Sequence, residues 1–404
     1  MPKNTIKYCK ICGKKSIKTI YDYGLQPICN RYIVKPFREE YIYPLVLCQC
    51  QSCATMQLSD TLPISEVVPR FDWVKYNEPE QHLDNFAESI YKVANLNFQS
   101  KVYGLTYKDS TILKRLETKC ETVKVNFIND SSNLDTGVEH LLATISFDKI
   151  KDFVKKNGCA DVVIARHILE HTQNPHQFLK CIKELVKPSG YIVFEVPDCE
   201  RAINSKDYNM IWEEHVLYFT KQTLFRLFKI GSLEVESFVN YPYDLENVLA
   251  VITKKNNKHS DYLIQDDISK ELNRGIEYGD SFIDICEKVK GYITTLRQNL
   301  GRLVFWGAGH IACTFINLMG ISNEIDCVID DHPSKKGFLM PLSHLPIRGS
   351  DILTDMDIKI CILAINPEIE KKLISKFQSY LDRGGKFLSI YPSSNLWIMN
   401  NILK

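Results

Sequence analysis

The sequence lacks any long apolar run. No stretch of about 18 uncharged apolar residues occurs, and the opening MPKNTIKYCK has no apolar core of the kind that a signal peptide carries. The chain also lacks a charge bias, because 50 basic residues stand against 49 acidic ones, and it has no basic cluster. These absences argue against a membrane-spanning helix and give no reason to expect nucleic acid or an anionic membrane as a partner. We therefore expect a cytoplasmic protein.

The chain does have enough length and apolar content for several cores. Its 404 residues are 45% apolar and 25% charged, which predicts a soluble globular protein of two or three domains. It also contains 14 cysteines. Without a secretory signal these thiols should stay reduced, which favours metal ligation and core packing over disulfides.

Four cysteines near the N-terminus have the spacing of metal ligands. Cys9 and Cys12 form one Cys-x-x-Cys pair, and Cys50 and Cys53 form a second. Two such pairs can place four thiolates around one Zn²⁺, and a segment with little apolar sequence needs that cross-link to fold. Because protein would fill all four positions, we expect the zinc to hold structure. Cys48 is an alternative ligand, and independent buried or redox thiols are the alternative interpretation.

The middle of the chain reads as alternating strands and helices. Residues 161–165 form an apolar, β-branched run typical of a buried parallel strand, and the polar residues 166–171 follow it, where an α/β sheet places its ligand crevice. A helical pattern over 175–186, a Lys-Pro-Ser-Gly turn and a second strand over 191–196 come next. The stretch closes with TrpGluGluHisValLeuTyrPheThr at 212–220. This order predicts an α/β fold with a parallel sheet.

This order of elements resembles the second half of the class I S-adenosylmethionine methyltransferase fold, which has a strand, a His-bearing loop, a helix, a Lys-Pro-x-Gly turn and a second strand. The closing segment is similar to the Tyr-x-Glu-His-x-x-Tyr-Phe signature of the three-domain sugar C-methyltransferases, which methylate nucleotide-linked keto-deoxysugars. The resemblance covers nearly the whole chain. It implies a zinc-binding domain at 1–75, a class I methyltransferase-like domain at 76–255, and a helical linker with a C-terminal Rossmann-like domain at 256–404. It also implies S-adenosylmethionine as cofactor and a nucleotide sugar as substrate, in polysaccharide or glycoconjugate biosynthesis, and we expect a monomer or homodimer.

By this resemblance His215 is the catalytic base and Glu214 is its partner. Removing a proton next to a ketone requires a base of moderate proton affinity, which an imidazole has at neutral pH, and a carboxylate beside it can orient it or stabilise its charged form. Trp212 replaces the family's tyrosine, so any role of that phenol is lost or moved to Tyr218. The alternative is a Glu-His pair that only caps a helix and packs.

Two further side chains are expected at the crevice. An aromatic residue before the central domain, Tyr76 or Trp73, should reach over the active site, and a hydrophobic hinge between domains is the alternative. Asp130, after the second strand, should grip the ribose hydroxyls of the cofactor, and a solvated loop acid is the alternative.

The expected cofactor loop has few glycines. Methyltransferases of this fold carry an acid and two or three glycines after their first strand, because the backbone approaches the cofactor closely there. Within 101–113 the acid falls on Gly104 and the glycines fall on Thr106 and Ser110, whereas Asp109 is kept. Side chains with a Cβ tolerate positive φ poorly, so we expect the usual loop to be strained or displaced. The full set expected to bind the cofactor is Tyr103, Gly104, Thr106, Asp109, Ser110, Asp130, Arg166 and His171.

The last part of the chain begins as a βαβ unit. An apolar strand at 303–306 runs into Gly307-Ala-Gly309, and two acids end the next strand about twenty residues later. In such a unit backbone N–H groups and a helix N-terminus can hold a phosphate. In the family the equivalent domain helps to bind the nucleotide sugar, and a nicotinamide site and a vestigial scaffold are the alternatives. The implied substrate-binding set is Glu195, Gly307, Gly309, His310, Asp331, Lys335 and Asn366.

The glycine-poor loop leaves a second function open. A divergent member of the family that lost methyl transfer would bind a nucleotide sugar or modify it in another way. Calorimetric titration with S-adenosylmethionine separates the two functions.

Overall fold

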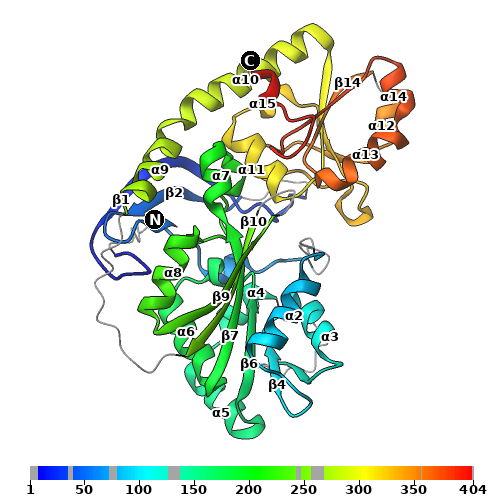
Figure 1. Cartoon of the computed structure of the whole chain (residues 1–404). Coiled ribbons are helices and arrows are strands. Elements are labelled where there is room, and N and C mark those ends of the chain that lie inside the picture. The colour runs from blue at the N-terminus through cyan, green and yellow to red at the C-terminus, as the bar shows by residue number, and fades with distance from the viewer. Residues whose placement is uncertain are drawn as a thin grey trace.

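The described residues fold around three β-sheets (Figure 1). This arrangement confirms the predicted α/β class. Within the described ranges, no helix is both long and apolar enough to cross a bilayer. The computed structural model describes residues 8–34, 40–71, 80–125, 137–242, 247–255, 268–355 and 357–402.

The N-terminal sheet has four strands in the order β1-β2-β3-β8, all antiparallel. The strands β1 (Ile17–Pro27), β2 (Ile42–Cys50) and β3 (Met56–Leu58) come from the N-terminal part of the chain. The fourth, β8 (Leu217–Tyr218), begins two residues after His215 of the Glu-His pair. The N-terminal sheet therefore contains a strand from the expected catalytic segment.

The central sheet has the order β5-β4-β6-β7-β10-β9, in which β10 runs antiparallel to both neighbours and the other pairs are parallel. Helices cover both of its faces, which is why the apolar run in β6 is fully buried. The helices α2 (Leu83–Val93) and α3 (Ser110–Leu116) pack on one face. The other face is covered by α4 (Val138–Thr144), α5 (Phe147–Asn157), α6 (Pro175–Glu184) and α8 (Lys221–Ile230). The strands are β4 (Lys101–Gly104), β5 (Glu121–Lys124), β6 (Ala160–Arg166), β7 (Val186–Asp198), β9 (Leu233–Tyr241) and β10 (Asn247–Lys255).

The junction between α6 and β7 differs from the prediction. The helix ends at Glu184, and the four residues 187–190 that were expected to turn are part of β7. Gly190 packs directly against the neighbouring strand, where an added Cβ would lie 2.7 Å from the carbonyl oxygen of Asp161. The glycine is therefore required by close contact with β6 and not by a turn.

The C-terminal sheet is fully parallel, in the order β13-β12-β11-β14-β15. Its strands are β11 (Arg302–Trp306), β12 (Cys327–Ile329), β13 (Ile347–Arg348), β14 (Ile358–Leu363) and β15 (Lys386–Ser389). Its helices are α11 (His310–Leu318), α12 (Ile352–Asp355), α13 (Pro367–Lys376), α14 (Gln378–Asp382) and α15 (Met399–Ile402). This is the predicted Rossmann-like unit.

Buried hydrogen bonds join the three parts. The helices α9 (Ser269–Asp280) and α10 (Phe282–Leu300) run from the N-terminal sheet to the C-terminal sheet (Figure 1). Gln49 of β2 donates to a backbone carbonyl of α9 at 2.8 Å. Tyr32 donates to the carbonyl of Ala308, in the loop after β11, at 2.6 Å. Two short helices, α1 (Ile64–Val67) and α7 (Cys199–Ser205), complete the set.

Candidate functional site

The four cysteines predicted to bind zinc lie together. Their Sγ atoms all lie within 4.8 Å of one another, with 3.5 Å between Cys9 and Cys53 and 3.5 Å between Cys12 and Cys50. A tetrahedral Zn²⁺ with Zn–S bonds of about 2.3 Å places its sulfur atoms about 3.8 Å apart, so the cluster fits this ion. The Sγ of Cys48 instead lies 3.8 Å from a threonine hydroxyl on β1, so the alternative ligand set is wrong. Four protein ligands leave no open position, and the zinc would hold structure.

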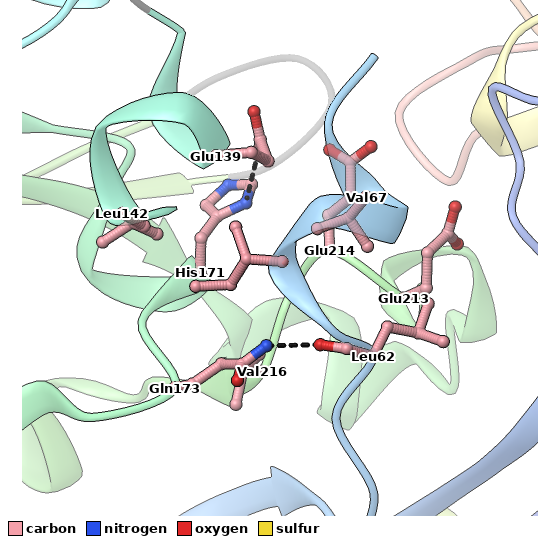
Figure 2. A pocket seen from close by; sticks show the side chains of 10 residues that line it. Leu62, Val67, Glu139, Leu142, His171, Gln173, Glu213, Glu214 and Val216 are labelled. Carbon is pink, nitrogen blue, oxygen red and sulfur yellow. Dashed lines mark hydrogen bonds and ion pairs between the residues drawn. The ribbon is translucent and has the colours of Figure 1, made fainter. Parts of the chain in front are cut away.

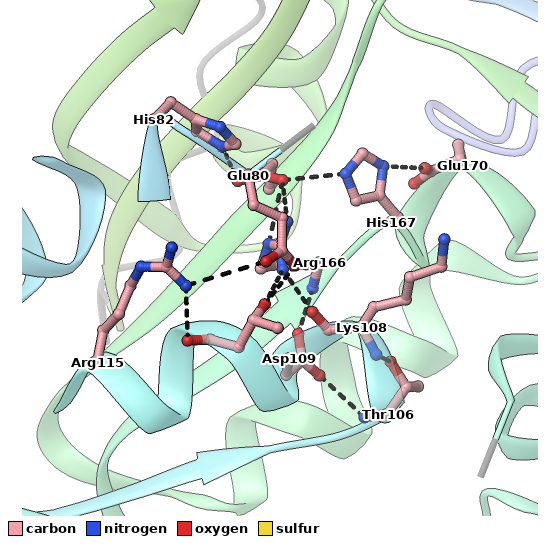
Figure 3. Close-up of polar contacts among 11 residues, drawn as sticks. Glu80, His82, Thr106, Lys108, Asp109, Arg115, Arg166, His167 and Glu170 are labelled. Carbon is pink, nitrogen blue, oxygen red and sulfur yellow. Dashed lines mark hydrogen bonds and ion pairs between the residues drawn. The ribbon is translucent and has the colours of Figure 1, made fainter. Parts of the chain in front are cut away.

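A buried ion-pair network closes the carboxyl end of β6 (Figure 3). The guanidinium of Arg166 donates to Oε1 of Glu195 at 2.8 and 3.0 Å and to the carbonyl oxygen of Lys108. Glu195 also bonds His82 at 2.9 Å and His167 at 3.0 Å. Burial would raise the pKa of the Glu195 carboxyl, but Arg166 and the two imidazoles hold it well below its usual range. Arg166 was predicted to bind the cofactor and Glu195 to bind the substrate. The structure corrects both roles, because the two side chains bond each other and hold in place the elements that border the crevice.

The expected cofactor loop has an ordinary backbone. It leaves β4 through a 3₁₀ turn and enters α3, and no residue from 104 to 110 has a positive φ. Thr106 is extended, at φ −133°, so the predicted strain is absent. Asp109 is fully buried and accepts N–H groups from Leu105, Thr106 and Arg166 at 2.8 to 2.9 Å. Burial raises the pKa of Asp109 to about 6.

In this loop the backbone N–H groups that could donate hydrogen bonds to S-adenosylmethionine are not free. The N–H groups of Leu105 and Thr106 are already taken by Asp109. At Gly104, where the family carries an acid, an added Cβ would lie 2.7 Å from Leu113 Cδ1 and 2.8 Å from Asp109 Cβ. No side chain fits there in this conformation, so the loop departs from the usual site in contacts as well as in sequence.

The other predicted cofactor and crevice residues divide into three groups. The hydroxyl of Tyr103 donates to the carbonyls of residues 157 and 158, before β6 begins, so Tyr103 faces the far end of the sheet and its predicted role is wrong. Ser110 starts α3 at the end of the loop. Tyr76, Trp73 and Asp130 lie outside the described residues.

His215 lies among aromatic rings. Its ring centroid is 4.8 Å from that of His171, 4.9 Å from that of Trp212 and 6.5 Å from that of Tyr218. Burial lowers the pKa of His215 well below its usual range, and His171 acts in the same direction. The imidazole is therefore neutral at pH 7 and can accept a proton. The hydroxyl of Tyr218 donates to the carbonyl of Trp212 at 3.3 Å and so holds this segment together, and its role in place of the family's phenol stays a prediction.

Glu214 is tethered to the N-terminal domain. Its Oε1 accepts a hydrogen bond from Nδ2 of Asn30 at 2.9 Å, and among the described residues its Oε2 has no hydrogen-bond partner. Burial raises the pKa of Glu214 well above its usual range, and the negative charges of Glu139 and Glu213 act in the same direction. The predicted pairing of Glu214 with His215 is corrected, because the carboxylate is bound by the asparagine.

Further carboxylates gather around His171 (Figure 2). Nδ1 of His171 lies 3.1 Å from Oε1 of Glu139, which α4 supplies. Donor atoms of Glu139, His171 and Glu214 lie within 4.8 Å of one another, and so do donor atoms of Glu170, His171 and His215. A cavity of about 10 Å³ borders the first of these groups. Chain segments far apart in the sequence thus bring acid and imidazole groups to one buried point.

The glycine loop of the C-terminal sheet lies next to this site. Gly307 has φ +105°, and an added Cβ would lie 2.6 Å from the carbonyl oxygen of Ala364, so only glycine fits. Gly309 has open space around it. His310, the first residue of α11, stacks on Trp212 with ring centroids 4.0 Å apart and planes at 27°. The stack brings the predicted nucleotide loop beside the segment that carries the base.

The other side chains predicted to bind substrate already have partners in the chain. Lys335 donates to the carbonyl of Ala308 at 2.9 Å and to Asp330 at 2.8 Å. Asp331 accepts a backbone N–H at 2.8 Å, and Asn366 caps α13. All of them follow the carboxyl ends of β12 or β14, the edge where this fold places ligands.

Sequence reasoning missed several residues of the site. Glu139, Asn30 and His82 come from segments that contain no motif, and only the folded chain brings them to the crevice. Glu170 was not missed, because it lies in the polar segment 166–171 that the sequence placed at the crevice.

Three family models match consecutive parts of the chain. Residues 9–67 match "Putative zinc binding domain", residues 106–237 match "Methyltransferase domain", and residues 252–392 match "C-methyltransferase C-terminal domain". The chain is also 21% identical over 408 residues to C-methyltransferase NovU of Streptomyces niveus, with 96% of each chain covered.

Solved structures match a little under half of the chain. One is 1,6-didemethyltoxoflavin-N1-methyltransferase of Burkholderia thailandensis, 12% identical, covering 44% of this chain and 80% of that chain with a TM-score of 0.30. Another is an S-adenosylmethionine-dependent methyltransferase of Clostridium acetobutylicum, 11% identical, covering 45% and 94% with a TM-score of 0.32.

The strand order of the central sheet and the four-cysteine cluster define the class: a methyltransferase fold joined to a zinc-binding domain. The matches place zinc-binding, methyltransferase and C-methyltransferase C-terminal domains in that order, and C-methyltransferase NovU is similar to the chain over its whole length.

Proposed function

We propose that this protein methylates the carbon next to the ketone of a nucleotide-linked keto-deoxysugar, in the biosynthesis of a polysaccharide or glycoconjugate. S-adenosylmethionine is the methyl donor in this proposal. The observation that carries it is the position of His215, a neutral imidazole beside the Trp212–His310 stack and therefore next to the glycine loop of the C-terminal domain. The three-domain composition supports the same function.

In this function His215 accepts the proton of the carbon next to the ketone. The electron pair that remains moves onto the ketone oxygen as an enolate, and the enolate carbon becomes the nucleophile. A positioned base of this kind contributes a factor of about 10² to 10⁴ to the rate. The donor, when bound, supplies the methyl group. Trp212 packs against the imidazole with ring centroids 4.9 Å apart, and it stacks on His310 in turn.

A second candidate function is favoured by the cofactor loop. Asp109 accepts the N–H groups of the loop, and Gly104 has no room for the family's acid. The alternative is therefore a divergent enzyme that deprotonates the sugar and does not methylate it. Such an enzyme would keep the base and the nucleotide loop and would need no methyl donor.

One experiment tests both functions. The protein is incubated with a nucleotide-linked keto-deoxysugar in deuterated buffer, with and without millimolar S-adenosylmethionine. A product that gains one methyl group only with the donor supports the methyltransferase. Deuterium exchange next to the ketone, with no methylation at any donor concentration, supports the alternative. Neither exchange nor methylation eliminates both.

A further inference from the structure

A buried cluster of three metal-binding side chains lies beside the proposed base. Glu139 comes from α4, His171 from the turn after β6, and Glu214 from the segment before β8. Their donor atoms all lie within 4.8 Å of one another (Figure 2). Donor atoms that share one ion at about 2.0–2.2 Å lie about 3 to 3.6 Å apart, and Nδ1 of His171 and Oε1 of Glu139 are already 3.1 Å apart. Small changes in rotamer would therefore let all three side chains reach one ion.

The cluster is buried and its hydrogen bonding is incomplete. Glu214 is 3% exposed and Glu139 is 8% exposed. Within the described part of the chain, Oε2 of Glu214 has no hydrogen-bond partner, whereas Nδ1 of His171 lies 3.1 Å from Oε1 of Glu139. Next to it, the 2% exposed Glu170 has no hydrogen-bond partner among these residues, but Nδ1 of His167 lies 3.6 Å from its Oε1 as an ion pair. Buried carboxylate oxygens are costly when unsatisfied, which points to a ligand at this place.

The chemistry of the cluster selects a small cation. Carboxylate oxygens and one imidazole nitrogen are the donors that Mn²⁺, Fe²⁺ and Zn²⁺ share, whereas Mg²⁺ and Ca²⁺ prefer oxygen alone. The adjoining cavity of about 10 Å³ has room for an ion or a water molecule. Asn30 holds Oε1 of Glu214 and so orients the carboxylate, as outer-shell partners of metal ligands do.

We propose that Glu139, His171 and Glu214 bind one divalent transition-metal ion, in a centre separate from the four cysteines. The role of this ion rests on the proposed function: it lies next to His215, where it withdraws electron density from the ketone oxygen and stabilises the enolate that forms there. The imidazole of His215 stays free to take the proton.

The test is metal binding, measured without sugar or methyl donor. Protein treated with a mild chelator is titrated with Mn²⁺, and the free Mn²⁺ is followed by electron paramagnetic resonance. We expect one saturable Mn²⁺ per chain in addition to one cysteine-bound zinc, which elemental analysis counts. Glu139→Gln and Glu214→Gln should each weaken Mn²⁺ binding by more than about tenfold. Glu213→Gln is the matched control, because Glu213 lines the same cavity outside the cluster, and it should bind Mn²⁺ like the wild type.

An unchanged zinc content and a cooperative melting transition establish that each variant is folded. The proposal is overturned if the wild type shows no saturable Mn²⁺ site, or if Glu139→Gln and the control bind Mn²⁺ equally well. It is also overturned if S-adenosylmethionine binds with an affinity that depends on Glu139 and Glu214 while Mn²⁺ does not bind, because the carboxylates then face a sulfonium. The metal titration and the methylation assay are independent measurements. A protein that binds no Mn²⁺ can still methylate the sugar, so failure of the metal proposal is distinguishable from failure of the proposed function.

Discussion

Met56 of β3 lies opposite Tyr218 of β8 in an antiparallel pair, and Gln57 lies opposite Leu217. This short ladder is the place where the zinc-binding sheet and the segment of His215 become one structure. Because β3 begins just after the second cysteine pair, loss of the zinc would loosen the strand that holds the base in position.

Cys53→Ser should therefore remove both the metal and the activity. We expect the zinc content to fall from one per chain to none, because three thiolates leave the tetrahedral site incomplete. The melting temperature should fall with it, and so should proton exchange at the sugar. Elemental analysis, thermal melting and deuterium exchange measure the three effects. Cys48→Ser is the control and should keep its zinc, since Cys48 lies outside the cluster. A wild-type protein that is folded and free of metal by native mass spectrometry would refute the zinc site.

His215→Ala should abolish exchange of the proton next to the sugar ketone and leave nucleotide binding intact. The expected drop is about 10² to 10⁴ in rate, the usual contribution of a positioned base. Exchange is followed by mass spectrometry in deuterated buffer, and nucleotide binding by calorimetry. Tyr218→Phe serves as the comparison, because its hydroxyl bonds only the carbonyl of Trp212 among the described residues, and exchange should continue. Exchange that persists in His215→Ala would assign the base to another group.

Glu213 should make the protein less stable as the pH rises from about 4.5 to about 7. Its Oε1 accepts the N–H of Cys29 at 2.5 Å, and burial raises the pKa of its carboxyl from 4.5 to about 7. In that range the folded state holds the proton while the unfolded chain has released it, so unfolding becomes easier as the pH increases. The rise in pKa corresponds to about 3 kcal/mol at most.

Glu213→Gln should flatten this dependence, because glutamine resembles the protonated carboxyl and keeps an acceptor for Cys29. Urea unfolding followed between about pH 4.5 and pH 7.5 measures the slope. The exposed Glu234→Gln provides the reference and should keep the wild-type slope. Equal slopes in the wild type and in Glu213→Gln would mean that the carboxyl titrates normally in the folded state.

The fold could be predicted from the sequence because its signals are local. The apolar run in β6, the two Cys-x-x-Cys pairs and the Gly307-Ala-Gly309 loop each lie within a few residues, and each occurs where it was expected. The error at residues 187–190 has a physical cause. A Pro and a Gly usually mark a turn, but here Gly190 is needed for close packing against β6.

The site was predicted less well because its contacts are not local. Glu214 was expected to pair with its sequence neighbour His215, yet Asn30, 184 positions away, binds it. Glu139 reaches His171 from a helix with no motif. Arg166 and Glu195 do lie at the crevice, as the strand ends predicted, but their charges neutralise each other there. Strand ends predict where a ligand binds, and tertiary packing decides which side chains remain available for it.

Asp109→Ala should destabilise the central domain. The carboxylate accepts three backbone N–H groups, including those of Leu105 and Thr106, and alanine leaves all three buried without an acceptor. Each unsatisfied group costs about 1–3 kcal/mol, so the loss is about 3 kcal/mol or more, which lowers the melting temperature by several degrees. Differential scanning calorimetry measures it, with the exposed Asp148→Ala in the first turn of α5 as the control, expected to change stability by less than about 1 kcal/mol. Equal melting temperatures for the two variants would mean that water enters the loop and satisfies the N–H groups, and the loop would then be open enough to offer them to a cofactor.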